Sequence, residues 1–249
     1  MPRYGRLYTS TVLRPLAEQA VLELHVQAGQ TVCDLMCDCA ALGEALGAAA
    51  GSRGEVVLVD TDATLLEESA RDVAASGCAV SIAISDGRKV PLGSSSCDRV
   101  GSLCTLGFWD GESLFDTAAR VTRPGGIAAL LTWGETDPPL HEAALAEAVR
   151  DVTGVASPFL SRCLAHVGAP DTSRWEALTL RDVVRFDGMA HFWAAMVAER
   201  PLAAELAGNP TDLTRGIRDA CEQRLRSRIA ADGTMRIPVT ASLWRYGLL

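Results

Sequence analysis

The sequence of 249 residues has little of what marks nucleic-acid-binding, membrane or secreted proteins. Lys89 is the only lysine, aromatic residues make up 5% of the chain, and the net charge is −8. No basic patch stands out, so we expect no affinity for nucleic acid. No apolar run reaches the length of a membrane span, and the N-terminal segment lacks the apolar region of a signal peptide. These absences predict a soluble, cytoplasmic protein that binds no membrane.

The eight cysteines do not follow the pattern of a disulfide framework or a metal site. Cys33, Cys37 and Cys39 are close together, but they lack the C-x2-C spacing of a zinc site, and no second pair of ligands follows. Four of the eight lie in or beside apolar, strand-like runs, where cysteine acts as a small hydrophobic residue. We therefore predict no metal.

What the chain does have is an alternation of apolar runs and helical stretches from Gly29 to Trp133. This pattern is typical of a parallel sheet covered by helices, and 48% hydrophobic residues can bury a substantial core. The predicted strands are residues 31–36, 55–60, 79–84, 98–104 and 127–133. A helix from about Thr11 to Leu24 is predicted before the first of them.

After Trp133 the pattern changes. Helices are predicted over 141–154, 158–168, 191–206 and 213–230, and strands over 175–186 and 234–247. We expect the two late strands to form an antiparallel pair at the sheet edge and the helices to form a lid where open α/β sheets bind ligands. The predicted fold is α/β and Rossmann-like, with a seven-stranded, mostly parallel sheet and helices on both faces. Residues 1–135 would form the cofactor-binding core, and residues 136–249 the helical lid and the strand pair that completes the same sheet.

Two acidic residues follow strands at places that suit an adenosyl ligand. Asp60 ends the second strand, where a carboxylate can accept hydrogen bonds from both ribose hydroxyls; otherwise it is only a polar residue at a strand end. Thr61 follows it, and Asp62 suits the N-cap of the next helix. Asp86, after the third strand, can accept from an adenine amino group; the alternative is that Asp86 and Gly87 simply make a turn.

Four segments, VCDLMCDCA, VVLVDTD, SDGRKVPLGSSSCDRV and RVTRPGGIAALLTW, occur in this order. Together they resemble the class I S-adenosylmethionine-dependent methyltransferase family, in particular its branch of ubiquinone- and menaquinone-pathway C-methyltransferases. The resemblance implies a Rossmann-like methyltransferase fold and S-adenosylmethionine as cofactor. It also implies that Pro124 ends a helix and that Gly125 and Gly126 turn into the fifth strand. The cofactor-binding residues that we predict are Asp34, Met36, Asp38, Asp60, Thr61, Asp86, Gly87, Leu103 and Cys104.

The family's glycine-rich loop is altered in this chain, because Met36, Asp38 and Ala40 stand where the family has glycine. Glycine suits those positions because a positive φ and a close approach to ligand disfavour a Cβ. We expect the Met36 thioether to point toward the methionine part of the cofactor. The Asp38 carboxylate would lie near the cofactor's own carboxylate, and like charges about 4 Å apart repel by up to about 4 kcal/mol at an effective dielectric constant of about 20. The alternatives are a contact with the cofactor's ammonium, compensation by Arg3 or Arg6, or an N-cap for the helix that begins near Ala40.

Methyl transfer depends mainly on orientation and needs a general base only for acceptors that carry a proton at the working pH. His141 is the predicted base; His166 and His191 are alternatives on amphipathic helices, where a histidine is more often structural. The predicted acceptor pocket contains Tyr4, Tyr8, Thr105, Phe108, Trp109 and Trp133. The resemblance implies Tyr4, Tyr8, Thr105 and Phe108. For Tyr4 and Tyr8 the alternative is a frayed terminus, and for Phe108 and Trp133 it is core packing. An aromatic lining favours a hydrophobic small molecule.

We therefore expect methyl transfer from S-adenosylmethionine to a hydrophobic small molecule, with natural-product biosynthesis as the setting. Two alternatives stay open. The chain could be a cyclase or pericyclase of the same fold, or a pseudo-enzyme that binds the cofactor weakly or not at all. Fold alone does not decide among them. The sequence also leaves the oligomeric state open, a homo-oligomer included.

Overall fold

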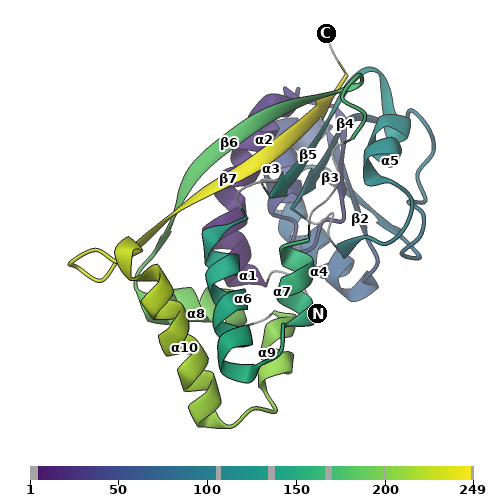
Figure 1. The fold of residues 1–249 in the computed structure, drawn as a ribbon. Helices are drawn as coiled ribbons and strands as arrows, with labels where there is room; N and C mark the ends of the chain where they lie inside the picture. The colour runs from purple at the N-terminus through teal and green to yellow at the C-terminus, as the bar shows by residue number, and fades with distance from the viewer. Residues whose placement is uncertain (1–4, 105–107, 134–137, 166–169, 199, 248–249) are drawn as a thin grey trace. The chain divides into compact units, whose positions relative to one another are not determined.

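The computed structural model describes residues 5–104, 108–133, 138–165, 170–198 and 200–247. Its strands form one seven-stranded sheet in the order β3-β2-β1-β4-β5-β7-β6 (Figure 1). The strands are β1 (Thr31–Leu35), β2 (Glu55–Asp60), β3 (Ala79–Ile84), β4 (Cys97–Leu103), β5 (Thr122–Trp133), β6 (Trp175–Phe186) and β7 (Met235–Tyr246). The pairs β1–β2, β2–β3, β1–β4 and β4–β5 are parallel. The predicted α/β, Rossmann-like fold is confirmed.

The helices alternate with the strands in the first half of the chain and cluster in the second. They are α1 (Arg6–Tyr8), α2 (Arg14–Leu24), α3 (Ala41–Ala50), α4 (Ala63–Ala74), α5 (Leu114–Val121), α6 (Leu140–Thr153), α7 (Pro158–Cys163), α8 (Met189–Val197), α9 (Pro201–Leu206) and α10 (Thr211–Leu225). A π-helical turn, Thr9–Leu13, links α1 to α2, so the first predicted helix is α-helical only from Arg14 onward.

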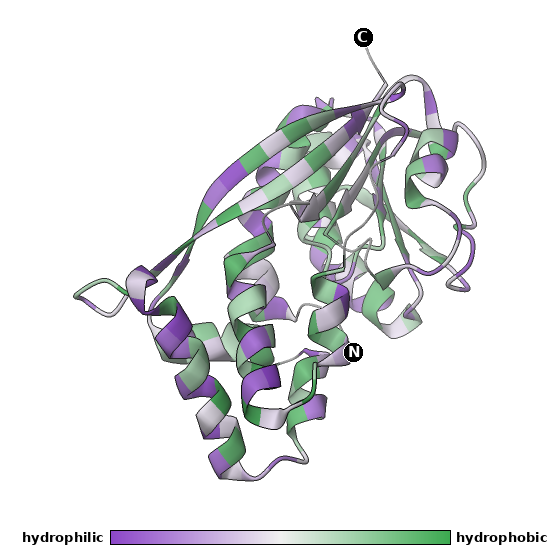
Figure 2. Cartoon of the chain, viewed as in Figure 1, coloured by the Kyte–Doolittle hydropathy of each residue, from purple (hydrophilic) through white to green (hydrophobic). Residues whose placement is uncertain are grey.

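The chain divides into two compact units, which we describe separately. The helical unit comprises Met1–Val12, Trp133–His166 and Arg181–Thr240. The sheet unit comprises Leu13–Thr132, Val167–Leu180 and Ala241–Leu249. Strands β6 and β7 have residues in both units, and hydrophilic and hydrophobic residues alternate along them (Figure 2). The boundary at residue 135 and the lid over the strand ends stay predictions.

One hydrophobic cluster of the sheet unit includes aromatic residues from late in the sequence. Phe115 of α5 makes edge-to-face contacts with Trp175, at 5.1 Å between ring centroids, and with Trp244, at 6.3 Å. Alternate residues of β1 and β2, among them Cys33 and Val57, point into the same cluster. This alternation is what a strand's two-residue period requires. The residues between them, such as Val32 and Val56, are also buried, so these strands are covered on both faces and read as continuous apolar runs.

The RVTRPGG segment differs from the expectation. Helix α5 ends at Val121, so Pro124 does not end it; Pro124 lies within β5, where the pairing with β4 is irregular. Gly125 has a φ of 76°. A Cβ on Gly126 would lie 2.7 Å from the carbonyl oxygen of Asp98. The two glycines therefore allow a distortion inside the fifth strand and not a turn before it.

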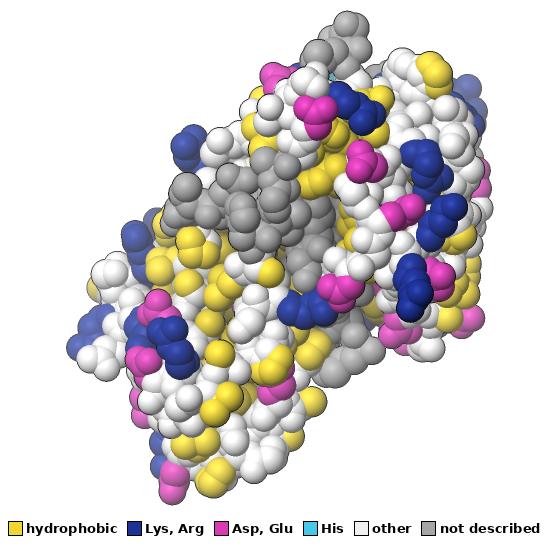
Figure 3. All heavy atoms as spheres, turned by 45° about the vertical axis from the view of Figure 1, so that its right-hand side comes forward, with side chains coloured by type: hydrophobic (Ala, Val, Ile, Leu, Met, Phe, Trp, Pro, Cys, Tyr) yellow, Lys and Arg dark blue, Asp and Glu magenta, His cyan; other side chains and the backbone are white. Residues whose placement is uncertain are grey.

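No helix within the described ranges is long and apolar enough to cross a membrane. On the face drawn in Figure 3, basic and acidic side chains are interspersed.

Candidate cofactor loop and buried histidine cluster

The loop that follows β1 has an unusual backbone. Met36, Asp38 and Ala40 all lie in the left-handed region, with φ values of 57°, 47° and 51°. These are the positions at which the resembling family has glycine. A left-handed residue with a Cβ costs roughly 1–2 kcal/mol, so three of them store on the order of 3–6 kcal/mol. Such strain persists only where the surroundings enforce it, and it gathers at functional sites.

Hydrogen bonds from β2 and α4 enforce this conformation. The backbone N–H of Cys37 donates to the carbonyl oxygen of Val59 at 3.0 Å. The N–H of Asp38 donates to Oδ2 of Asp60 at 3.1 Å, and the Ser69 hydroxyl donates to the carbonyl oxygen of Asp38 at 2.9 Å. The loop is thus fixed to the end of the neighbouring strand. No pattern in the sequence indicates that the Ser69 hydroxyl binds the loop.

Asp34 binds the first turn of α3 through a hydrogen bond. Oδ2 of Asp34 accepts the N–H of Gly43 at 2.8 Å, and a Cβ on Gly43 would lie 2.8 Å from Cδ2 of Leu58. The N-cap residue of α3 is Ala40, and no side chain caps this helix. The interpretation of Asp38 as the N-cap is therefore wrong.

The Met36 side chain is 2% exposed and packs in the hydrophobic cluster of the sheet unit. Burial of a methionine side chain stabilises by roughly 1.5–3 kcal/mol, which is comparable with the cost of its left-handed backbone. The packing of Met36 thus helps to hold the loop.

Asp60 is fully buried at the end of β2. Its Oδ1 accepts the N–H of Thr61 at 2.7 Å, while Oδ2 holds Asp38. A ribose reaches this carboxylate only when the side chain is uncovered. Asp62 caps α4 as predicted, because its side chain accepts the N–H of Leu65 at 3.1 Å.

Asp86 is exposed after β3. Its Oδ1 accepts the N–H groups of Arg88 at 2.9 Å and of Lys89 at 3.0 Å, and Gly87 has a φ of 81°. The hydrogen bond from Arg88 holds the pKa of the Asp86 carboxyl below its usual value, so this side chain is an acceptor at neutral pH. The residues form the turn that the alternative interpretation predicted, and the turn leaves Asp86 at the surface.

The other predicted residues of the sheet unit lie at the end of β4 and just beyond it. Leu103 and Cys104 are buried, and Cys104 has a φ of 55°. Phe108 and Trp109 are half-buried, and the indole N–H of Trp109 donates to the carbonyl oxygen of Glu112 at 2.5 Å. Tyr4, Thr105 and His166 lie outside the described residues.

The helical unit brings three predicted residues together: Tyr8, Trp133 and His141. The Tyr8 hydroxyl oxygen lies 3.0 Å from Nε2 of His141. The Trp133 ring meets the His141 ring edge to face, at 5.8 Å between centroids. Tyr8 and His141 are both buried.

Burial lowers the pKa of His141 to about 4; Glu142 opposes this shift and Arg200 adds to it. The imidazole is therefore neutral at pH 7. Nδ1 of His141 and Nε1 of Trp133 are buried and have no hydrogen-bond partner within the described part of the chain. Buried polar atoms of this kind are rare and call for an explanation such as a ligand or an ordered water.

An ion pair that sequence reasoning missed adjoins this cluster. Nη2 of Arg200 lies 2.7 Å from Oε1 of Glu142, and both side chains are fully buried. The guanidinium stacks over the rings of Tyr8, 4.4 Å from its centroid, and Phe159, 4.8 Å from its centroid. The burial of Glu142 could be predicted from the sequence, because helical spacing places Glu142 on the same buried face of α6 as Leu145. Nothing around Arg200 in the sequence predicts its burial.

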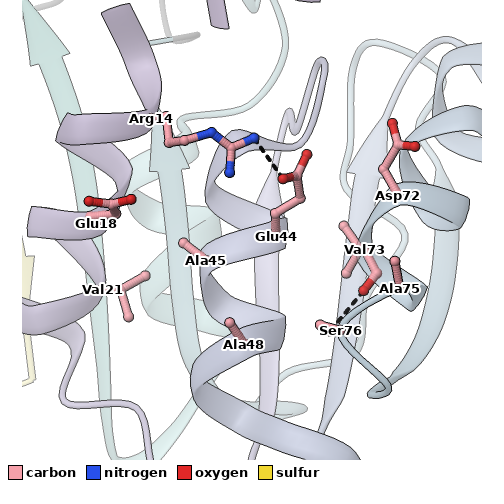
Figure 4. Close-up of a pocket in the computed structure, with 10 residues that line it drawn as sticks. All are labelled: Arg14, Glu18, Val21, Glu44, Ala45, Ala48, Asp72, Val73, Ala75 and Ser76. Carbon is pink, nitrogen blue, oxygen red and sulfur yellow. Dashed lines mark hydrogen bonds and ion pairs between the residues drawn. The ribbon is translucent and has the colours of Figure 1, made fainter. Parts of the chain in front are cut away.

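His191 is not part of this cluster: its Nδ1 accepts the N–H of Asp187 at 3.1 Å. The structure also has surface cavities. One of about 470 Å³ lies in the sheet unit between α2, α3 and α4, where Arg14 pairs with Glu44 (Figure 4). Another of about 490 Å³ lies in the helical unit beside Val152. The lining of these two cavities includes no predicted site residue.

Comparison with known proteins gives one family match and many similar structures. Residues 38–130 match the family described as "Methyltransferase domain". The YcgJ protein of Bacillus subtilis is 12% identical, with 93% of this chain and 97% of that chain covered and a TM-score of 0.56. A putative methyltransferase from Bacillus halodurans C-125 is 12% identical, with 92% and 96% covered and a TM-score of 0.54. A cyclopropane-fatty-acyl-phospholipid synthase-like protein from Lactobacillus casei is 18% identical, with 94% and 90% covered and a TM-score of 0.54. No protein of curated function matches the sequence.

The strand order and these structural similarities define a Rossmann-like fold of the class I methyltransferase type. Within that fold, residues 38–130 are similar to a methyltransferase domain, and this similarity implies S-adenosylmethionine as the cofactor. The branch to which the chain belongs stays a prediction.

Proposed function

We propose that this chain transfers a methyl group from S-adenosylmethionine to a hydrophobic small molecule, with His141 as the proton acceptor and natural-product biosynthesis as the setting. When bound, the cofactor supplies an electrophilic methyl group on a sulfonium. The observation that carries the proposal is the left-handed backbone at Met36, Asp38 and Ala40. The loop keeps the conformation that glycine normally provides, and backbone strain of this kind gathers at functional sites.

The chain's own residues fit the adenosyl group in two ways. Asp60 stands at the end of β2, where Rossmann-like folds hold a ribose, and it is already tied to the loop through the N–H of Asp38. Asp86 presents an exposed carboxylate after β3 as an acceptor for an amino group. These residues and the loop backbone would hold the cofactor.

On the acceptor side, His141 is suited to take a proton. When its Nε2–H donates to the Tyr8 oxygen, the lone pair on Nδ1 can receive a proton from the acceptor molecule. The lowered pKa keeps that lone pair present throughout the neutral range. The ring of Trp133 and its buried Nε1–H offer an apolar surface and a donor to the same molecule. This chemistry suits a hydroxyl, phenol or amine.

A second function, that of a non-methylating cyclase or a pseudo-enzyme of the same fold, is favoured by one observation. The Asp60 carboxylate is fully buried and already accepts backbone hydrogen bonds, and Asp38 is 3% exposed. A bound cofactor must uncover the Asp60 carboxylate and accommodate the negative charge of Asp38. If that cost exceeds the binding energy, the fold serves other chemistry.

Calorimetric titration with S-adenosylmethionine and S-adenosylhomocysteine distinguishes the two. Under the proposal, the wild type binds both and Asp60→Asn, which removes the charge but keeps the size, weakens binding by roughly tenfold or more. Asp62→Asn is the matched control: it changes a neighbouring carboxylate that caps α4 and should leave the affinity unchanged.

Asp38→Gly separates the remaining outcomes, because it removes a charge and suits the left-handed backbone. If the wild type binds the cofactor and the Asp38→Gly variant binds it more tightly, the proposed geometry is supported. If the wild type does not bind the cofactor and the Asp38→Gly variant does, methyl transfer by the native chain is contradicted and the second function is favoured.

A further inference from the structure

Strand β3 lies at one end of the sheet and is unusually exposed. Its neighbour in the strand order is β2, and the pairing is continuous from Glu55–Ala79 to Asp60–Ile84. The exposed fractions of Ile82 and Ile84 are 43% and 53%. The outer row of backbone N–H and C=O groups therefore belongs to a strand that is paired without interruption on its inner side and has two exposed isoleucines.

This edge lacks the features that usually prevent edge-to-edge pairing. Protected edges carry charged residues, above all lysine, or proline or a bulge. The sequence of β3, AVSIAI, contains no charged residue and no proline, and its pairing register has no shift. The β-branched residues Val80, Ile82 and Ile84 favour extended structure. The strand is suited to accept another strand.

We propose that β3 pairs in antiparallel fashion with β3 of a second copy of this chain, which makes one continuous sheet across a homodimer. A two-fold axis perpendicular to the sheet keeps each face on its own side, so opposed residues must point to the same face. An axis through Ile82 meets this condition. It places Ile82 opposite its own copy and Val80 opposite Ile84, and it joins the exposed isoleucines into one apolar ladder.

Charge favours a second copy as the occupant. Because β3 carries no charge, the self-pair brings no like charges opposite each other, and the strand offers nothing that would select a charged partner. Beyond the carboxyl end of β3 lie the exposed Asp86, Arg88 and Lys89, one acidic and two basic side chains whose net charge is +1, and at its amino end Glu55 opposes Ala79. Antiparallel pairing carries this net positive end of one copy toward the acidic residue of the other.

Sedimentation velocity on the intact chain tests the proposal over concentrations up to about 100 µM, since dimerisation follows mass action. We expect the wild type to form a dimer. Ile82→Lys, which places two charges opposite each other at the axis, should raise the dissociation constant by roughly tenfold or more. Leu22→Lys is the control, because Leu22 is 72% exposed on α2 of the same unit. A monomeric wild type, or a dimer that Ile82→Lys weakens no more than Leu22→Lys does, overturns the proposal.

A cross-link tests the register without relying on dissociation. Opposed residues of an antiparallel pair have Cα atoms about 4.5–5.5 Å apart, which a disulfide can span. With oxidised glutathione as the oxidant, Ile82→Cys should form a covalent dimer, whereas Leu22→Cys should not. The eight native cysteines are all buried and add little background. Equal cross-linking of the two variants contradicts the assigned edge. Circular dichroism of every variant verifies folding, and none of these measurements depends on methyl transfer.

Discussion

Protonation of His141 should destabilise the folded chain as the pH falls. Its pKa is about 4 when folded and 6.5 when exposed. Below the exposed value the unfolded state binds a proton that the folded state does not, so stability is complete above about pH 6.5 and falls toward pH 4. One pKa unit corresponds to about 1.4 kcal/mol. Titration of His141 should therefore lower the free energy of unfolding by about 1.3 kcal/mol between pH 7.5 and 5.5, and by about 3 kcal/mol in the acid limit.

Urea unfolding of the wild type and of His141→Gln at these two pH values isolates this contribution. Glutamine cannot be protonated in this range and can still form a hydrogen bond with the Tyr8 hydroxyl, for which its amide group can be the donor, while the carboxylates titrate alike in both proteins. The wild type should lose about 1.3 kcal/mol more than the variant between the two conditions. Equal losses would refute the assignment of a buried, neutral imidazole, and with it the proposed proton acceptor.

Two further predictions concern the loop and the ion pair. Met36→Gly should lower the free energy of unfolding by about 1–3 kcal/mol, because the packing that it loses outweighs the backbone strain that it relieves. Ala40→Gly should lower the free energy of unfolding by less than about 0.5 kcal/mol. Equal effects of the two variants in urea unfolding would contradict the packing role of Met36. Glu142→Met should cost about 3–5 kcal/mol, because it leaves the Arg200 charge buried without its carboxylate, and the double variant with Arg200→Met should recover most of that loss. Additive losses in thermal unfolding would argue against a coupled pair.

Much of the sheet could be predicted because strands carry their signal locally. Runs bounded by turn residues predicted β2, β3 and β6 over the residues that the structure shows. The start of β5 was not predictable from local rules, since Pro124 normally marks a break. There the chain tolerates proline because β5 is distorted beside its two glycines.

The site could be predicted only in part. The resemblance to the family's glycine-rich loop indicated where the loop needs a positive φ, but the hydrogen bonds that hold the loop come from Ser69 and Asp60, which are distant in the sequence. The family resemblance predicted Tyr8, position and chemistry predicted Trp133 and His141, and the mutual contacts of the three depend on tertiary packing. Arg200 shows the limit most clearly, because an arginine is almost never fully buried and no local pattern marks the exception.

The proposed function requires that the strained loop after β1 and Asp60 together form a cofactor site. A crystal structure of the chain grown with S-adenosylhomocysteine tests it most directly. We expect the ligand at the carboxyl ends of β1 and β2, with its ribose hydroxyls within hydrogen-bonding distance of Asp60 and its amino-acid part against the backbone of residues 36–40. A ligand bound elsewhere, or a structure in which Asp60 stays buried and no ligand is present, would contradict it.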